Sequence, residues 1–284
     1  MKSLYKVCKK HGSVLTYTME PPSDESDSEN DINNNQVLLP DDIQKYKSEH
    51  DIVERQEFLE YLCNIHTPEI IRNIESITKE QIDDPMWHEY RKGRITASIM
   101  GSVLKCNMER LNENNYIVKK IQSSATFFST QATDYGKSME GVARNQYTEQ
   151  YIKSHQKAEI LKAGLSISPA CPIIAASPDG YVKCLCGGEG LLEIKCTYTH
   201  QHKYTKDIAS ENNYVHLVND EVKLKENSPW YSQIQTQLFV TGKSWCDFVL
   251  FTQKDFATDR IYFNAEYFDM CLKKAIDFYF KFIM

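Results

Sequence analysis

Three side chains that could hold a divalent ion and act on a phosphate group lie close together in the sequence. Asp179 belongs to a Ser-Pro-Asp-Gly run at residues 177–180, and Glu193 and Lys195 follow it, two residues apart. Carboxylate oxygens are the ligands that Mg²⁺ prefers, and an ammonium group beside them can position water or stabilise developing negative charge. These residue types suit the hydrolysis of a phosphodiester.

The flanking residues predict strands that would position this group. The apolar run at 173–176 is typical of a buried strand that ends at the Ser-Pro-Asp-Gly turn. Residues 181–185 and 191–195 predict the two strands of a hairpin joined by a glycine-rich bend. Because side chains alternate along a strand, Glu193 and Lys195 should share one face and the apolar residues around them the other.

Each motif also has a purely structural interpretation. A Glu-x-Lys pair on a strand is usually a solvent-exposed pair of charges, and Pro-Asp-Gly is among the commonest turns. Their combination, in the order Pro-Asp, hairpin, Glu-x-Lys, resembles the signature of PD-(D/E)XK nucleases and favours a metal-dependent site.

A second group of residues could bind an anion. Thr96 is a suitable N-cap for the helix that follows it, which places Ser98 in the first turn, where free backbone N–H groups favour negative charge. Arg91 and Arg94 come just before this turn. The alternative is that both arginines are surface charges beside a packed Trp87.

The remaining pattern predicts helices and strands in alternation. Residues 135–147 predict a helix whose buried stripe leaves Glu140 at its boundary, either as an ordinary carboxylate or reaching into a site. Strands are predicted at 245–252 and 260–263, and a final helix through 268–279.

One predicted helix carries three glutamines. Pro229 is typical of its first turn and Gly242 of its end. The apolar face excludes Gln233, Gln235 and Gln237, which are therefore available for polar contacts. 

The composition divides the chain into three parts. Of its 284 residues, 41% are hydrophobic, and the net charge of −6 is concentrated in residues 20–60, where 13 acids face three bases, so the rest is mildly basic. We expect a disordered acidic tail at 1–40, an accessory helical segment at 41–78 and a nuclease domain at 79–284. Nine scattered cysteines and no apolar run near 18 residues predict an intracellular protein, nuclear or cytoplasmic, without a membrane span.

Four blocks in order resemble the YqaJ-type viral recombinase family, which contains bacteriophage lambda exonuclease and belongs to the PD-(D/E)XK nucleases. The resemblance covers roughly residues 80–255 and rests on these blocks: Trp87, Arg91 and 95–98; 136–144; 177–180 with 192–196; and 233–241. It implies an α/β fold, with a restriction-endonuclease-like core in which helices flank a central mixed sheet, preceded here by the helical extension.

The resemblance implies roles for individual residues. Mg²⁺, which Mn²⁺ can replace, would be bound by Asp179, Glu193, Glu140 and the carbonyl of Ile194. Lys195 would position the attacking water and, beside two carboxylates, should remain protonated. Gln235 best matches the family's helix glutamine, since an aromatic residue stands four positions on, and Gln233 is the competing assignment.

The resemblance also implies a substrate. Arg91, Ser98 and Ser177 match positions that hold a terminal 5′-phosphate, so we expect a DNA exonuclease that degrades one strand of linear duplex DNA from its 5′ end, in recombination or repair. An endonuclease of the same fold and a catalytically silent DNA-binding module are the alternatives. A single-strand annealing protein and a homo-oligomer are the partners compatible with the family.

A rival metal site would use cysteine and histidine. The spacings of Cys184, Cys186, Cys196, His200 and His202 are imperfect for structural zinc. We therefore expect free thiols, with Cys196 packed in the interior.

Overall fold

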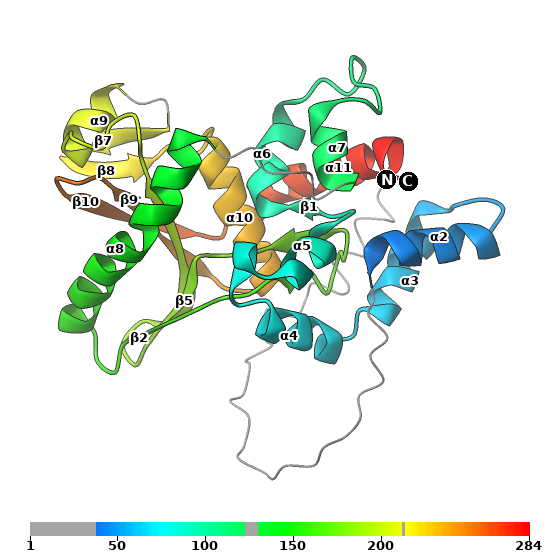
Figure 1. Ribbon diagram of the computed structural model, residues 1–284, viewed down its shortest axis with the longest axis horizontal. Coiled ribbons are helices and arrows are strands. Elements are labelled where there is room, and N and C mark those ends of the chain that lie inside the picture. Colours follow the sequence, from blue (N-terminus) through cyan, green and yellow to red (C-terminus); the bar gives the residue numbers. More distant parts are fainter. Residues whose placement is uncertain (1–37, 123–129, 212–213) are drawn as a thin grey trace, which may run out of the picture.

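The computed structural model describes residues 38–122, 130–211 and 214–284 (Figure 1). The predicted acidic tail at 1–40 lies outside these residues except for its last three, of which Leu39 already begins a helix and is fully buried. No helix in the described part of the chain is long and apolar enough to cross a membrane.

The N-terminal helices share a core with the rest of the protein. They are α2 (Leu39–Glu49), α3 (Arg55–Ile65) and α4 (Pro68–Ile77), followed by the short 3-10 helix η1 (Gln81–Asp83). Leu39, Phe58 and Leu62 pack in the same apolar cluster as the C-terminal helix α11 (Ala265–Phe282). Residues 41–78 are helical as predicted, and they have no separate core of their own.

The central sheet has five strands in the order β10-β9-β6-β5-β2. The pairing of β6 with β9 is parallel and the other pairings are antiparallel, which confirms the predicted α/β fold with a mixed sheet. The strands are β2 (Glu159–Leu161), β5 (Gly180–Cys184), β6 (Gly188–Cys196), β9 (Trp245–Phe251) and β10 (Phe256–Tyr262).

Helices cover both faces of this sheet (Figure 1). The long helix α8 (Gln131–Ser154) packs on one face, and α10 (Pro229–Thr241) and α9 (Thr205–Glu211) pack on the other. Alternate residues of β9 therefore meet different helices, which is why every residue of this strand is buried.

The remaining elements flank this layer. A three-stranded sheet, β1-β4-β3, and a hairpin, β7-β8, lie beside the central sheet. The elements are α5 (Pro85–Arg91), β1 (Ile95–Thr96), α6 (Ala97–Lys105), α7 (Tyr116–Gln122), β3 (Ser166–Ile167), β4 (Ile174–Ala176), β7 (Val215–Val218) and β8 (Glu221–Leu224).

Strand register brings the predicted acids together. Gly180 of β5 pairs with Leu192 of β6, and the backbone N–H of Asp179 donates to the Leu192 carbonyl at 3.1 Å, so Asp179 lies beside Glu193. Gly188, with φ of +71°, supplies the predicted positive-φ bend of the hairpin. Gly190 has another role: a Cβ there would lie 2.3 Å from the indole ring of Trp245.

Candidate nuclease active site

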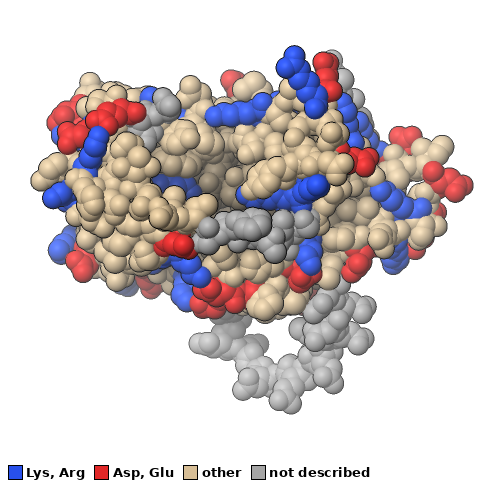
Figure 2. Space-filling view, turned by 45° about the horizontal axis from the view of Figure 1, so that its top comes forward, with Lys and Arg blue, Asp and Glu red and all other residues tan. Residues whose placement is uncertain are grey.

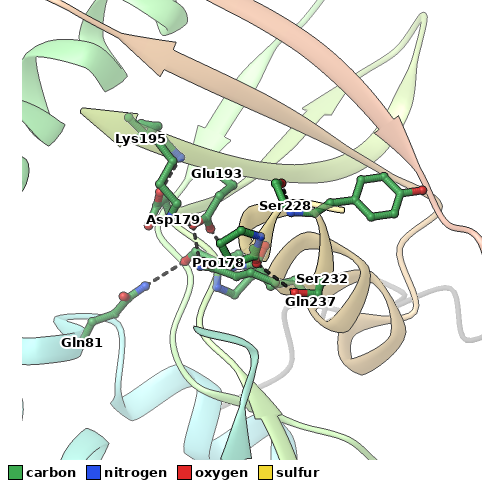
Figure 3. Close-up of polar contacts among 12 residues, drawn as sticks. Gln81, Pro178, Asp179, Glu193, Lys195, Ser228, Ser232 and Gln237 are labelled. Atoms are coloured by element: carbon green, nitrogen blue, oxygen red, sulfur yellow. Dashed lines mark hydrogen bonds and ion pairs between the residues drawn. The ribbon is translucent and has the colours of Figure 1, made fainter. Parts of the chain in front are cut away.

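The hairpin carries a compact group of two carboxylates and an ammonium group. Figure 3 shows Asp179, Glu193 and Lys195 grouped where the two strands run side by side. Asp179 Oδ2 accepts a 2.6 Å hydrogen bond from the backbone N–H of Ile194, and Lys195 Nζ lies 2.5 Å from Glu193 Oε1. Glu193 is almost completely buried, whereas Lys195 keeps about a quarter of its side chain exposed. The group therefore has a buried side and a side open to solvent.

Two amides of α10 hold the buried carboxylate. Gln233 Nε2 donates to Glu193 Oε1 and Gln237 Nε2 donates to Glu193 Oε2, both at 2.6 Å. Ser228 caps this helix by accepting from the backbone N–H of Tyr231. Both oxygens of Glu193 are thus oriented by neutral donors in addition to Lys195.

The assignment of Gln235 to this group is wrong in its geometry. Gln235 Nε2 donates to the Tyr262 carbonyl at 2.8 Å, and its Oε1 accepts from the backbone N–H of Asn264 at 2.7 Å, so this side chain ties α10 to the end of β10. Residues four apart lie on the same helix face, whereas residues two apart do not. The i, i+4 spacing puts Gln233 and Gln237 on one face of α10, but only packing decides that this face meets Glu193, and the sequence did not single out Gln237.

Burial and the neighbouring carboxylates act together on the pKa of Asp179 but in opposite directions on the pKa of Lys195. Burial, together with the carboxylates of Glu193 and Glu140, raises the pKa of Asp179 well above its ordinary value. Burial alone would lower the pKa of Lys195, but the carboxylates of Glu193 and Asp179 outweigh it and the pKa is raised. Lys195 therefore carries a proton at neutral pH, as expected from the sequence.

Glu140 approaches this group from α8 without joining it. Its carboxylate is close enough to raise the pKa of Asp179, but Oε1 accepts a 2.8 Å hydrogen bond from Arg144 one turn along the helix. Among the described residues, the carboxylate oxygens of Asp179, Glu193 and Glu140 do not all lie within 4.8 Å of one another. The carboxylates of Asp179 and Glu193 repel the carboxylate of Glu140, and Glu140 pairs instead with the guanidinium of Arg144.

The turn before Asp179 is held by a residue that the sequence did not single out. Gln81 of η1 donates from Nε2 to the carbonyls of Pro178 and Ala163, each at 2.8 Å (Figure 3). Its own φ of +48° is unusual for a residue with a side chain, so the surrounding structure must hold it in place. Gln81 therefore links the helical segment to the turn that presents Asp179.

The three predicted phosphate-binding residues are connected through two neighbours. The guanidinium of Arg91 lies over the ring of Trp87, 3.9 Å from its centroid, and Trp87 Nε1 donates to Ser177 Oγ at 2.8 Å. Thr96 Oγ1 lies 3.5 Å from Arg91 Nη2 and 3.3 Å from Ser98 Oγ.

Arg91 has no carboxylate partner within 4.0 Å among the described residues. Burial lowers its pKa to about 10, which still leaves it charged at neutral pH. Ser98 is exposed in the first turn of α6, as predicted, although Thr96 does not cap that helix with its side chain. An unpaired guanidinium beside two hydroxyl groups is suited to an anion.

Arg94 does not belong to the group formed by Arg91, Ser98 and Ser177. Its side chain is buried and donates to the carbonyls of Pro172 and Tyr90 and to Nε2 of His66. It links α5, the end of α3 and the segment before β4.

One face of the molecule is hollowed near its middle (Figure 2). Lysine and arginine side chains lie in and beside the hollow, and most of the acidic side chains in this view lie toward the edges. The overall negative charge therefore does not cover this face evenly.

The fold is that of known exonucleases. LHK-Exo, an alkaline exonuclease from Laribacter hongkongensis solved in complex with dAMP, is 24% identical, with a TM-score of 0.54 over 70% of this chain and 92% of that chain. A SOX–DNA complex is 13% identical, with a TM-score of 0.50 over 75% of this chain and 70% of that chain. A KSHV SOX–RNA complex is also 13% identical, with a TM-score of 0.51 over 75% and 73%. At sequence identities this low, the similarity to these structures shows a shared fold and nothing beyond it.

The family follows from the sequence of the central region. The model of the YqaJ-like viral recombinase domain matches residues 86–244, more than half of the chain, and the chain belongs to this family. The resemblance stated from the four sequence blocks is thereby confirmed. A search of curated proteins finds no match.

Proposed function

We propose that this protein is a metal-dependent deoxyribonuclease that removes nucleotides from the 5′ ends of linear duplex DNA. The observation that carries the proposal is the group of Asp179, Glu193 and Lys195, in which the buried carboxylate is oriented by two glutamine amides. The hollowed face with basic side chains supports a polyanionic substrate.

The donor set fits a hard divalent ion. Asp179 Oδ1 has no hydrogen-bond partner among the described residues, and carboxylates with a backbone carbonyl are the ligands that Mg²⁺ and Mn²⁺ prefer. Asp179, Glu193, Glu140 and the carbonyl of Ile194 would hold the ion, and Glu140 would have to leave Arg144 to do so. When bound, Mg²⁺ would neutralise charge on the phosphate and lower the pKa of a bound water.

The chain's own residues would prepare the reaction. Lys195, protonated and with about a quarter of its side chain exposed, would donate to the attacking water or to a non-bridging phosphate oxygen. Gln233 and Gln237 would keep Glu193 in one orientation throughout. Because Lys195 keeps its proton, its role is to position and to stabilise charge and not to act as a general base.

The choice of a 5′ end is proposed from Arg91, Ser98 and Ser177, which would together form a pocket for a terminal phosphate. Ser177 is two residues before Asp179 and accepts from Trp87, on which Arg91 lies, so the pocket adjoins the acidic group. A terminal phosphate bound by Arg91, Ser98 and Ser177 would place the first phosphodiester near Asp179. A homo-oligomer and a single-strand annealing partner remain predictions of the family resemblance.

A comparison of linear and closed circular duplex DNA with Mg²⁺ tests the activity. Degradation of the linear form alone supports the exonuclease, attack on both forms supports the endonuclease, and binding without cleavage supports the silent module. RNA belongs in the same assay, because one structure of similar fold is an RNA complex.

The site is tested with Asp179→Asn, Glu193→Gln and Lys195→Ala. Each should abolish cleavage while DNA binding and the circular dichroism spectrum are retained. Cleavage at the wild-type rate in any of the three would show that the assigned site is not the catalytic one.

A further inference from the structure

A second cluster of metal-ligating side chains lies at the far end of the central hairpin. His155, Cys184 and Cys186 form the one group of at least three His, Cys, Asp or Glu residues, within the described parts of the chain, whose ligand atoms all lie within 4.8 Å of one another. Cys184 ends β5, Cys186 is in the turn before β6, and His155 directly follows α8. The sequence spacing singles out both of these cysteines but combines them with Cys196, His200 and His202, which do not belong to this group, and it does not point to His155.

The distances within the cluster match one face of a zinc tetrahedron. Zinc–sulfur bonds of about 2.3 Å and zinc–nitrogen bonds of about 2.0–2.1 Å at tetrahedral angles place two sulfurs about 3.8 Å apart, and sulfur and nitrogen about 3.6 Å apart. The two sulfurs are 3.6 Å apart. His155 Nδ1 lies 3.5 Å from Cys184 Sγ and 3.2 Å from Cys186 Sγ.

Neighbouring groups orient these ligands. The backbone N–H of Gly187 donates to Cys184 Sγ at 3.0 Å, and the Tyr151 hydroxyl lies 3.3 Å from the same sulfur. The ring of Tyr151 stacks on the ring of His155, with centroids 4.0 Å apart. N–H donors to sulfur and a packed imidazole are the outer contacts that hold ligands in protein metal sites.

We propose that His155, Cys184 and Cys186 bind one zinc-class ion, with a water molecule as the fourth ligand. Two soft sulfur ligands and an imidazole select zinc over the hard ions that carboxylates prefer. Cys184 follows Asp179 by five residues, which corresponds to about 16 Å of extended strand, so this ion would be separate from the one at the acidic group.

The ion would connect two elements that the nuclease site depends on. Helix α8 carries Glu140 toward Asp179 and ends next to His155, about 22 Å further along the helix at 1.5 Å per residue. Because one ion would be coordinated by His155 and by both hairpin cysteines, it would hold the end of α8 against the hairpin that presents Asp179. The ion would thus act as a clip between helix and hairpin, and its binding does not depend on the proposed nuclease activity.

Cobalt substitution tests the site without measuring cleavage. The full-length reduced protein is stripped of metal and titrated with Co²⁺, and the wild type should develop a thiolate-to-cobalt charge-transfer band and tetrahedral visible bands that saturate at one ion per chain. Cys186→Ser and His155→Asn should each remove this signal. Cys186 is exposed and His155 half-buried, so both variants should fold, which circular dichroism checks.

Matched variants locate the ion. Cys106→Ser, at a half-buried cysteine that is not part of the cluster, and Asp179→Asn should keep the full signal. Zinc should displace cobalt and raise the melting temperature of wild type but not of Cys186→Ser. Its affinity in the ligand variants should fall by more than the roughly 10–100-fold that loss of an outer contact costs.

Three results would contradict the proposal. One is a reduced wild type that binds cobalt without a thiolate band, and another is a thiolate band that persists in both Cys186→Ser and His155→Asn. The third is loss of the band in Asp179→Asn, which would contradict a site separate from the acidic group.

Discussion

Gln237 Nε2 donates a 2.6 Å hydrogen bond to Glu193 Oε2 inside the protein, where both side chains are shielded from water. A buried carboxylate needs such donors, because the charge is costly to leave unsatisfied. The amide cannot titrate, so it orients Glu193 at any pH at which the carboxylate is ionised. This contact leads to the first prediction.

Replacing Gln237 by Leu should lower the rate of DNA cleavage by about 10–100-fold and raise the Mg²⁺ concentration needed for half-maximal activity, as expected when an outer partner of a metal ligand is lost. Gln235→Leu is the matched control, because Gln235 is equally buried but bonds to Tyr262 and Asn264. It should lower the melting temperature and leave the Mg²⁺ requirement unchanged. Equal Mg²⁺ requirements in the two variants would contradict the role assigned to Gln237.

Asp179 should make the metal-free protein less stable as the pH rises. Its pKa is raised in the folded state, so over the range from just below its ordinary pKa up to the raised value the folded state binds more protons, and the free energy of unfolding falls with increasing pH. Asp179→Asn keeps an acceptor for the Ile194 N–H and removes the charge. Removing this charge repulsion, on the order of 1 kcal/mol, should raise the melting temperature of the metal-free Asp179→Asn variant by roughly 2–4 °C.

The measurement is thermal unfolding with and without Mg²⁺ at several pH values. Mg²⁺ should stabilise the wild type, by about 2.7 kcal/mol at a hundredfold excess over its Kd, and should hardly affect Asp179→Asn. A metal-free variant that melts below the wild type at neutral pH would argue against repulsion within the acidic group.

His66 should make the fold sensitive to acid. Burial and the neighbouring Arg94 lower the pKa of His66 to about 3, and the neutral ring accepts from Arg94 at Nε2 while Nδ1 donates to the Leu62 carbonyl. The unfolded state therefore binds a proton first, and stability is lost as the pH falls from about 6.5 toward 3, at about 1.4 kcal/mol per pH unit. Asp42, whose pKa burial raises to about 6, contributes with the opposite sign.

The contribution of His66 is isolated by comparing wild type with His66→Gln in urea unfolding between pH 7 and 4. The variant should show a smaller loss of stability on acidification, while His202→Gln, at an exposed histidine, should follow the wild type. If the free energy of unfolding falls equally with pH in wild type and His66→Gln, the His66 ring takes up its proton as readily in the folded state as in the unfolded state, and the prediction is wrong.

Arg91 should determine the preference for a phosphorylated end. Its guanidinium has no carboxylate partner among the described residues and lies next to Trp87, so a terminal phosphate would gain a charge-assisted contact. Loss of such a contact is worth roughly 1.5–3 kcal/mol, or about one to two decades in rate. Wild type should digest 5′-phosphorylated duplex faster than 5′-hydroxyl duplex, and Arg91→Ala should remove the difference.

The control for this prediction is Lys92→Ala. Lys92 is the neighbouring residue, but its ammonium pairs with Glu89, so the preference should persist in that variant. If wild type digests both substrates at the same rate, the pocket does not bind a 5′-phosphate and the endonuclease alternative gains support.

The sequence by itself determined the elements whose interactions are local. Hairpin pairing joins residues close along the chain, so Asp179, Glu193 and Lys195 were predictable from one turn and one alternating strand. The limits of α10 followed from Pro229, which the first turn of a helix tolerates, and Gly242, which adopts φ of +67° at its end.

The tertiary structure decided which side chains meet across elements. Helix α10 is buried on nearly every side, so its pattern could not reveal that Gln233 and Gln237 face Glu193 while Gln235 faces β10. The rotation of a helix about its axis depends on how it packs against the sheet, and that depends on residues far away in the chain. For the same reason the meeting of His155 with the hairpin cysteines appears only once α8 lies along β5 and β6.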